Sequence, residues 1–207
     1  MKTMQRVLGV GVVAAAVGTL AFLGSQTQST AVAEAAPAPA PAPSGDFTID
    51  PVHSNIIFGI KHLNATNFHG RLNDFSGSFT LGDTASIDVT VKAESVDTNQ
   101  PKRDAHIKSP DFFSAKEFPT ITFKAKDLKH AGEGAWSGKG DLTFRGVTKP
   151  IDLTLTMTGE GKGQGGKQIV GLESKITIKR SDFGNNFMVG PLSDEVTLLV
   201  NFEGNIK

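Results

Sequence analysis

From Phe47 to the C-terminus, apolar residues repeatedly occupy every second position of short segments. This period of two is that of a β-strand with one buried face, whereas an amphipathic helix repeats every three to four residues. The pattern is clearest in the segments 56–60, 87–91, 121–125, 151–157 and 196–202. The chain must therefore fold mainly as strands that bury one face against a shared core.

The pattern gives about eight strands, and short connections such as 145–148 and the glycine-rich stretch 159–167 favour consecutive antiparallel pairing. Between residues 66 and 81 the apolar positions change from even to odd numbers, which predicts a bulge or a corner near Asn73–Asp74. Eight strands closed into a barrel would have no exposed edges. A two-sheet sandwich fits the same periodicity, so the pattern alone leaves both architectures open.

Charge and cysteine content exclude several classes of protein. The 21 basic residues balance the 21 acidic residues, so the charge favours no nucleic-acid partner. The chain has no cysteine, which excludes disulfides, thiolate nucleophiles and cysteine-based metal sites. The fold must therefore be stabilised by packing alone.

The N-terminal region differs from the rest of the chain. Lys2 and Arg6 precede an apolar run over 7–24, and small residues at 31–33 suit a cleavage site. We predict an export signal over 1–33, with a retained membrane anchor as the alternative, and a periplasmic or extracellular location. The Ala/Pro-rich stretch 34–46 is predicted to be a tether, which leaves one folded domain at 47–207.

One insert carries helix signals, and it lies between the strands predicted at 87–91 and 121–125. Asn99, or the threonine before it, is predicted to cap a first short helix opened by Pro101, and Ser109 to cap a second. Three phenylalanines precede the next strand, and an apolar barrel end would bury each at roughly 1.5 to 3 kcal/mol. We therefore expect a short helical insert near 99–117 that acts as a lid.

Few residues suggest catalysis or metal binding. His53 and Ser54 invite a hydrolase interpretation, but adjacent strand residues point to opposite faces and cannot easily act as base and nucleophile. His62, His69 and His106 lack the close spacing of a zinc motif. We predict no catalytic residue, no metal and no cofactor.

Six segments, in order along the domain, together resemble the YceI-like family of exported lipid-binding proteins. These are FTIDPVHSNIIF at 47–58, RDAHIKSPDFF at 103–113, FPTITF at 118–123, GDLTFRGVTKP at 140–150, KRSDFG at 179–184 and LSDEVTLLVNFEG at 192–204. The resemblance implies a lipocalin-like, eight-stranded antiparallel up-and-down barrel with a long apolar cavity for a polyisoprenoid or related amphiphile, and no known catalysis. Phe47 and the loop at 159–167 depart from the family pattern.

The inward strand faces are then predicted to line the cavity. We expect a lipid to contact Ile56, Phe58, Ile60, Val89, Val91, Ile121, Phe123, Trp136, Gly140, Leu142, Phe144, Leu153, Leu155, Ile176, Ile178, Leu198 and Val200. Five polar residues are predicted at the mouth and lid, namely Arg103, Asp104, His106, Arg180 and Asp182. They either hold the lid through caps and salt bridges or meet the head of a bound lipid.

The sequence thus predicts an exported protein that sequesters or carries a polyisoprenoid, an isoprenoid quinone or a similar amphiphilic lipid. Its N-terminal segment would bring it near a membrane. Two other interpretations remain open at this point. One is a hydrolase that uses His53 and Ser54, and the other is a structural envelope or stress protein whose barrel is filled by side chains.

Overall fold

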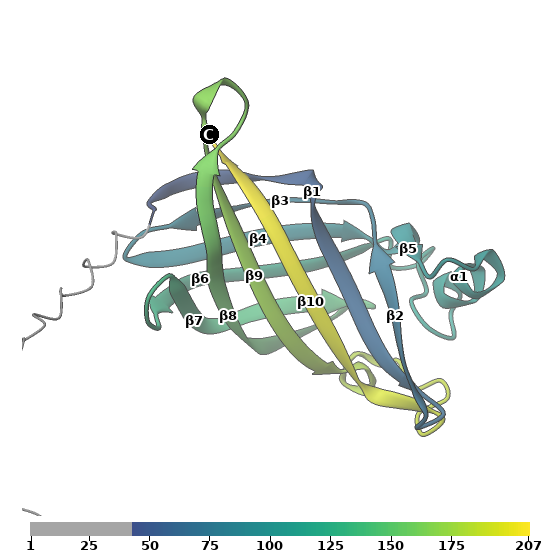
Figure 1. Cartoon of the computed structure of the whole chain (residues 1–207). Helices are drawn as coiled ribbons and strands as arrows, with labels where there is room; N and C mark the ends of the chain where they lie inside the picture. The colour runs from purple at the N-terminus through teal and green to yellow at the C-terminus, as the bar shows by residue number, and fades with distance from the viewer. Residues whose placement is uncertain (1–42) are drawn as a thin grey trace, which may run out of the picture. The chain divides into compact units, whose positions relative to one another are not determined.

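The strands of the computed structural model, which describes residues 43–207, join into one antiparallel sheet that closes on itself (Figure 1). They are β1 (Gly45–His62), β2 (Thr66–Leu72), β3 (Phe75–Leu81), β4 (Thr84–Lys92), β5 (Val96–Asp97), β6 (Thr120–His130), β7 (Ala135–Phe144), β8 (Val147–Lys162), β9 (Gln168–Lys179) and β10 (Leu192–Ile206). The helical elements are α1 (Pro101–Lys108) and the 3-10 turns η1 (Ala93–Ser95), η2 (Gln164–Gly166) and η3 (Arg180–Phe183). The predicted export signal lies outside the described residues.

Pairing between the first and last strands closes the barrel. β1 pairs antiparallel with β10, for example at Phe58↔Leu198, and the circle then runs β1-β3-β4-β6-β7-β8-β9-β10. Each strand of this circle thus has a neighbour on both sides. The eight-stranded up-and-down barrel is confirmed, and the sandwich alternative is wrong.

The predicted corner near Asn73–Asp74 is also present. β2 and β3 follow each other along the same strand, since β2 pairs with the second half of β1 and β3 pairs with residues 45–48 of β1. The two residues between β2 and β3 interrupt the strand, and the apolar positions change from even to odd residue numbers across them. β2 pairs with β1 on one side and with the two-residue β5 on the other, so β2 and β5 are additional to the closed circle of eight strands.

The insert forms one helix rather than two. α1 opens at Pro101, and its N-cap is Gln100, whose side chain accepts the Arg103 N–H at 3.0 Å, while Asn99 adopts a left-handed backbone with φ of 59°. No helix among residues 43–207 is long and apolar enough to cross a membrane.

The second predicted helix is replaced by turns. Ser109 ends α1 in an extended conformation, with φ of −71° and ψ of 170°, because the following Pro110 disfavours helical backbone in the residue before it. The chain then folds back, and the Phe113 N–H donates to the Ile107 carbonyl at 2.9 Å. The three phenylalanines of this segment, Phe112, Phe113 and Phe118, are half-buried.

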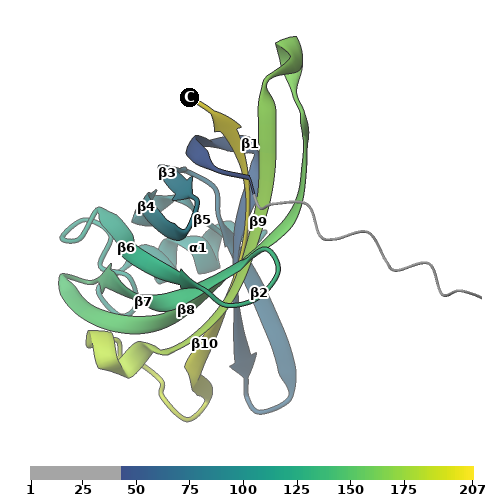
Figure 2. The ribbon, with the colours of Figure 1, turned by 90° about the vertical axis from the view of Figure 1, so that its left-hand side faces the viewer.

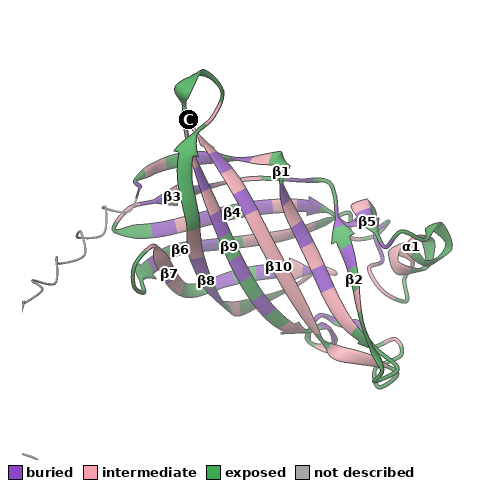
Figure 3. Ribbon diagram, in the orientation of Figure 1, coloured by how far each residue is buried: buried purple, intermediate pink, exposed green. Residues whose placement is uncertain are grey.

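Large side chains fill one part of the barrel interior, and buried residues alternate with exposed ones along its strands (Figure 3). Trp136 is fully buried, and its Nε1–H donates to the Gly82 carbonyl at 2.9 Å. Phe47 stacks on Phe79 with ring centroids 5.1 Å apart. The buried Phe47 is thus a core residue, although it departs from the family pattern.

The glycine-rich stretch lies on the long β8–β9 hairpin. Residues 159–162 belong to β8 and pair with β9, so only 163–167 form the connecting loop. None of these residues lines the cavity described below. This departure from the family pattern therefore leaves the cavity wall unchanged.

A glycine in β10 shows how tightly the filled part is packed. A Cβ on Gly204 would lie 2.3 Å from the Phe79 ring and 2.9 Å from the Phe47 Cβ, whereas a Cβ on Gly159 in β8 would meet nothing within 4 Å. We predict that Gly204→Ala lowers the free energy of unfolding by about 1 to 3 kcal/mol because overpacking strains the core. Gly159→Ala is the matched control and should change it little. Equal denaturant midpoints for the two variants would contradict this packing.

Candidate ligand-binding cavity

The other part of the barrel encloses a cavity of about 430 Å³. This volume is within the range of small-molecule sites, which are mostly apolar with a few polar groups. Many of the residues that the sequence analysis assigned to a lipid site line it, namely Ile56, Phe58, Ile60, Val89, Val91, Ile121, Phe123, Leu142, Phe144, Leu153, Leu155, Ile176, Ile178, Leu198 and Val200. The barrel is therefore not filled throughout.

Two of the residues assigned to the cavity lie elsewhere. Trp136 is fully buried and is not part of the cavity lining. A Cβ on Gly140 would lie 2.3 Å from Cζ of Phe123, and a Cβ on Gly138 would lie 2.9 Å from Cδ2 of Leu128. These glycines therefore make room for neighbouring side chains, and Gly140 is not part of the cavity lining.

The structure adds wall residues that sequence reasoning missed. They include Phe68, Leu72, Ile87, Ile107, Phe112, Phe113, Met188, Leu192, Val196 and Phe202. Ile87, Val196 and Phe202 follow the strand periodicity and could have been included on that signal. Phe112 and Met188 lie in irregular segments, where no periodicity indicates which way a side chain points.

The exposed members of the lining mark the mouth of the cavity. They are His62 at the end of β1, Arg103 and His106 on α1, and Met188 in the loop 184–191. Figure 2, which looks into the barrel from the opposite end, shows α1 behind the strands. The insert thus covers the end of the barrel as a lid, as the sequence predicted.

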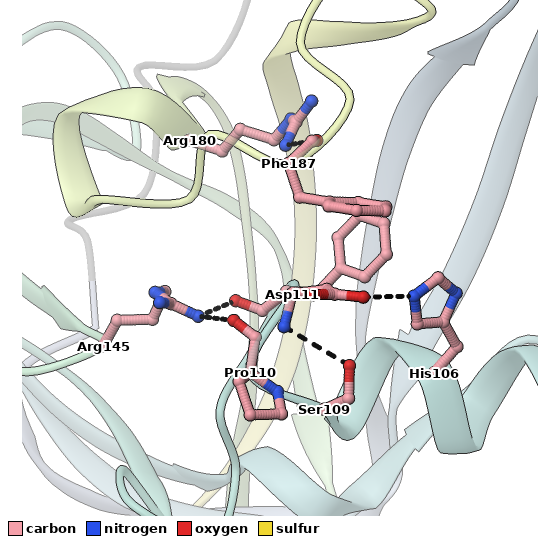
Figure 4. Close-up of polar contacts among 8 residues, drawn as sticks. His106, Ser109, Pro110, Asp111, Arg145, Arg180 and Phe187 are labelled. Atoms are coloured by element: carbon pink, nitrogen blue, oxygen red, sulfur yellow. Dashed lines mark hydrogen bonds and ion pairs between the residues drawn. The ribbon is translucent and has the colours of Figure 1, made fainter.

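Arg145 fixes the lid to the barrel (Figure 4). It lies in the tight β7–β8 turn, where Arg145 and Gly146 have φ of 51° and 71°. Its NH1 group donates to the carbonyls of Pro110, at 3.0 Å, and Phe112. The sequence analysis noticed only the turn, because nothing along the chain links this arginine to carbonyls about 35 residues away.

Aromatic packing joins the lid to the loop 184–191. His106, Phe112 and Phe187 pack edge to face, with ring centroids 5.1 to 5.5 Å apart. His106 Nε2 lies 2.8 Å from an oxygen of Asp111 (Figure 4). On the inner side, the Phe113 ring packs against Phe144 at 5.2 Å. The lid is therefore held by apolar contacts as well as by Arg145.

Arg103 and Asp104 both bind Thr98 rather than each other. Arg103 donates to the Thr98 hydroxyl at 2.8 Å and to its carbonyl at 2.7 Å, and its guanidinium lies 4.5 Å from the Phe68 ring centroid. Asp104 accepts hydrogen bonds from the N–H and the hydroxyl of Thr98. These contacts hold the start of α1, so the expected capping role is present but the salt bridge is not.

Arg180 is the most unusual polar group in the cavity wall, since its side chain is only 3% exposed. Its guanidinium donates to main-chain carbonyls of its own hairpin, at Asn185, Phe187, Leu192 and Ser193, and to the Asn185 side chain. Burial lowers the pKa of Arg180, although the nearby Asp194 carboxylate opposes this effect.

Arg180 and Asp182, both assigned to the polar mouth by the sequence analysis, do not form an ion pair with each other. Asp182 is exposed. Within the described part of the chain, residues 43–207, Arg180 forms no salt bridge. Asp194 accepts hydrogen bonds from the hydroxyl of Ser181 at 2.7 Å and from its N–H at 2.9 Å, and these bonds lower the pKa of Asp194. Arg180 is thus a buried cation at an apolar wall without a directly bonded carboxylate.

The two residues of the hydrolase interpretation point to opposite sides of β1. Ser54 is buried, and its hydroxyl accepts the Glu203 N–H at 2.9 Å. His53 is 64% exposed, and its Nδ1 lies 2.8 Å from an oxygen of Asp50. His53 is therefore not placed to act as a base for the Ser54 hydroxyl.

One group of side chains that could bind a metal ion differs from the histidines considered in the sequence analysis. Within the described residues, His62, His69 and His106 form no such group, whereas single ligand atoms of Asp50, His53 and Glu203 lie within 4.8 Å of one another. This group lies where β1 bulges away from its register with β10, between Asp50 and Asn55. Its hydrogen bonding holds this surface bulge together, and the cavity does not include it.

A closed barrel with an apolar cavity under a lid defines a protein of the ligand-binding β-barrel class. Comparison with known proteins gives the family. Residues 47–204 match the YceI-like domain, and the chain belongs to this family.

Relatives and solved structures agree with this assignment. A UPF0312 protein of Pseudomonas aeruginosa is 40% identical over 167 residues, which cover 78% of this chain and 87% of the relative. The crystal structure of the Campylobacter jejuni YCEI protein matches with a TM-score of 0.65 and 35% identity, over 71% of this chain and 90% of that one. A polyisoprenoid binding domain from Saccharophagus degradans shares the fold, with a TM-score of 0.61, 14% identity and coverage of 78% and 98%.

We predict that Arg145→Ala loosens the lid without unfolding the barrel, because it removes the donor that holds the carbonyls of Pro110 and Phe112. Amide hydrogen exchange over 111–118 should become faster while exchange in β8 and β9 stays unchanged. Lys149→Ala, on an exposed residue of β8, is the control. Unchanged exchange in the lid would contradict the role of Arg145.

The pair of Asp50 and His53 predicts a pH effect. The hydrogen bond to Asp50 raises the pKa of His53 above 6.5, and the same bond lowers the pKa of Asp50 below 3.8. The pair therefore stabilises the fold between these values. This contribution is lost as pH rises through the folded pKa of His53 or falls through that of Asp50.

Asp50→Asn tests this directly. In an NMR titration the pKa of His53 should fall toward 6.5 because its hydrogen-bonded carboxylate is gone. Asp88→Asn, which removes a carboxylate paired with Lys124 on β6, is the control and should leave His53 unchanged. A pKa of His53 that is the same in all three proteins would rule out the pairing.

Proposed function

We propose that this protein sequesters or carries an amphiphilic lipid with an isoprenoid-like tail, which it holds in the barrel cavity. The observation that carries the proposal is the 430 Å³ apolar cavity inside a closed barrel. Transfer of a hydrocarbon tail from water into such a cavity is favourable by about 0.8 kcal/mol per methylene. The polyisoprenoid-binding domain among the structural neighbours supports the same ligand class.

The polar groups near the mouth suggest where a head group would lie. Arg103 and His106 line the exposed mouth, and Arg180 adds a positive charge to the inner wall. A phosphate or carbonyl oxygen would be attracted to the positive charges of the two arginines, so a polyisoprenoid phosphate and an isoprenoid quinone both fit.

The proposed role is binding without chemistry. Ser54 and His53 face opposite sides of β1, and the cavity wall is almost entirely apolar. We further propose that the protein acts outside the cytoplasm, in the periplasm or the extracellular space. The basic residues Lys2 and Arg6 followed by the apolar run 7–24 support this location.

Native mass spectrometry of the full chain purified from its own host tests the function. We expect a bound amphiphile whose mass identifies the tail. Val89→Phe combined with Leu198→Phe should abolish the bound mass, because both side chains line the cavity and the added rings would fill it. Leu199→Phe, at the neighbouring position of β10 that does not line this cavity, is the matched control and should retain the ligand.

Three results would contradict the proposal. The first is that no lipid co-purifies and none can be loaded from added isoprenoid. The second is that the two cavity-filling substitutions leave binding unchanged. The third is a strong loss of melting temperature in the ligand-free form of that variant, which would show that the space is already occupied by side chains.

A further inference from the structure

Exposed apolar side chains gather at the open end of the barrel. Among residues 43–207, four large hydrophobic side chains are strongly exposed, and three of them are Leu63 at 59%, Met188 at 44% and Val189 at 45%. The fourth, Val52 at 81%, lies in the surface bulge of β1 beside His53. We call the three residues the mouth tip.

Two loops that are far apart in sequence build the mouth tip. Leu63 lies in the turn 63–65 between β1 and β2, and Met188 and Val189 lie in the loop 184–191 before β10. The Leu63 N–H donates to the Pro191 carbonyl at 2.7 Å, which ties the two loops together. Figure 1 shows them side by side beyond the ends of β1 and β10, and Figure 3 shows exposed residues on both.

The backbone of the mouth tip favours other residue types. Leu63 and Met188 have φ of 49° and 52°, a left-handed conformation that suits glycine or asparagine better than a large apolar residue. Their exposed side chains gain little from the protein core in return. Apolar residues at such positions therefore point to a partner that buries them.

Lys61 is the one formally charged side chain in the two sequence stretches that build the mouth tip, 59–70 and 183–193. Residues 59–70 contain Lys61, His62 and His69 but no acidic residue, and residues 183–193 contain no charged side chain. Lys61 is exposed. Among the carboxylates that follow in β10, Asp194 is engaged by Ser181. Exposed apolar side chains beside a lysine, with no carboxylate in these two stretches, are a combination that suits an anionic lipid surface.

The mouth tip is also continuous with the cavity. Met188 is both exposed and part of the cavity lining, and His62, directly before Leu63, lines the mouth. A surface that covered the mouth tip would therefore also cover the opening. For a ligand with a hydrocarbon tail, this arrangement would keep the tail out of water during entry and release.

We propose that the mouth tip docks onto an anionic membrane surface, with Leu63, Met188 and Val189 inserted among the lipids and Lys61 near their head groups. Docking places the opening of the cavity against the membrane from which a lipid is taken or to which it is delivered. The purpose of docking rests on the proposed function, but docking itself can be measured without a ligand in the cavity.

Site-specific fluorescence tests the proposal on the full chain. Leu63→Trp places a reporter in the mouth tip, and Val52→Trp places one at an equally exposed site outside it. The chain's single tryptophan, Trp136, is fully buried and gives a constant background. Because each reporter senses only its surroundings, any membrane binding by residues 1–42 affects both proteins alike.

The probes are vesicles of phosphatidylcholine with and without phosphatidylglycerol, with bromine on the acyl chains as quencher. We expect the added fluorescence of Leu63→Trp to be quenched, more so with phosphatidylglycerol, and that of Val52→Trp to persist. Adding Lys61→Glu to Leu63→Trp should raise the lipid concentration for half-maximal quenching about fivefold or more. Leu63→Trp combined with the two cavity-filling phenylalanines should still be quenched, which separates docking from ligand binding.

Three results would overturn the proposal. The first is that the fluorescence of Leu63→Trp is not quenched by either type of vesicle. The second is equal quenching of Leu63→Trp and Val52→Trp, which would mean that the protein has no preferred orientation. The third is a blue shift of Leu63→Trp that grows with protein concentration without lipid, which would mean that the mouth tip binds a second copy of the chain.

Discussion

The pairing of β1 with β10 is the constraint on which the rest of the structure depends. Because it joins the two ends of the sheet, it gives every strand of the circle a neighbour on each side and turns one face of the whole sheet into an interior. A flat or two-layered sheet would have to fill that space by packing against a second layer. A closed barrel can retain empty space, because its hydrogen-bonded wall is supported all the way round.

The interior is then divided into a filled part and an open part. Trp136 and the stacked rings of Phe47 and Phe79 fill one part, and aliphatic and phenylalanine side chains under the lid surround the cavity in the other part. Strands stabilise the filled part through packing. The open part depends on contacts between irregular segments, which open locally more readily than the hydrogen-bonded strands of the barrel wall.

At the open end, two arginine side chains donate hydrogen bonds to carbonyl groups of irregular backbone. Arg145 binds carbonyls of the lid, and Arg180 binds carbonyls of the loop before β10. Irregular backbone that is partly buried needs partners for its carbonyl groups, and a guanidinium with five N–H donors can supply several at once. The same two segments meet through His106, Phe112 and Phe187, so the polar and aromatic contacts together shape the mouth.

The sequence by itself determined the strands, the corner after β2 and most of the cavity wall, because a period of two assigns each side chain to a face wherever the strand is regular. Only the tertiary structure decided which inward residues border empty space, since that depends on what lies across the barrel, as the ring of Phe123 against Gly140 shows. The tertiary structure also decided the partners of Arg145 and Arg180 and the meeting of Leu63 with Met188 and Val189. No local pattern encodes these contacts, because each joins irregular segments that closure of the sheet brings together.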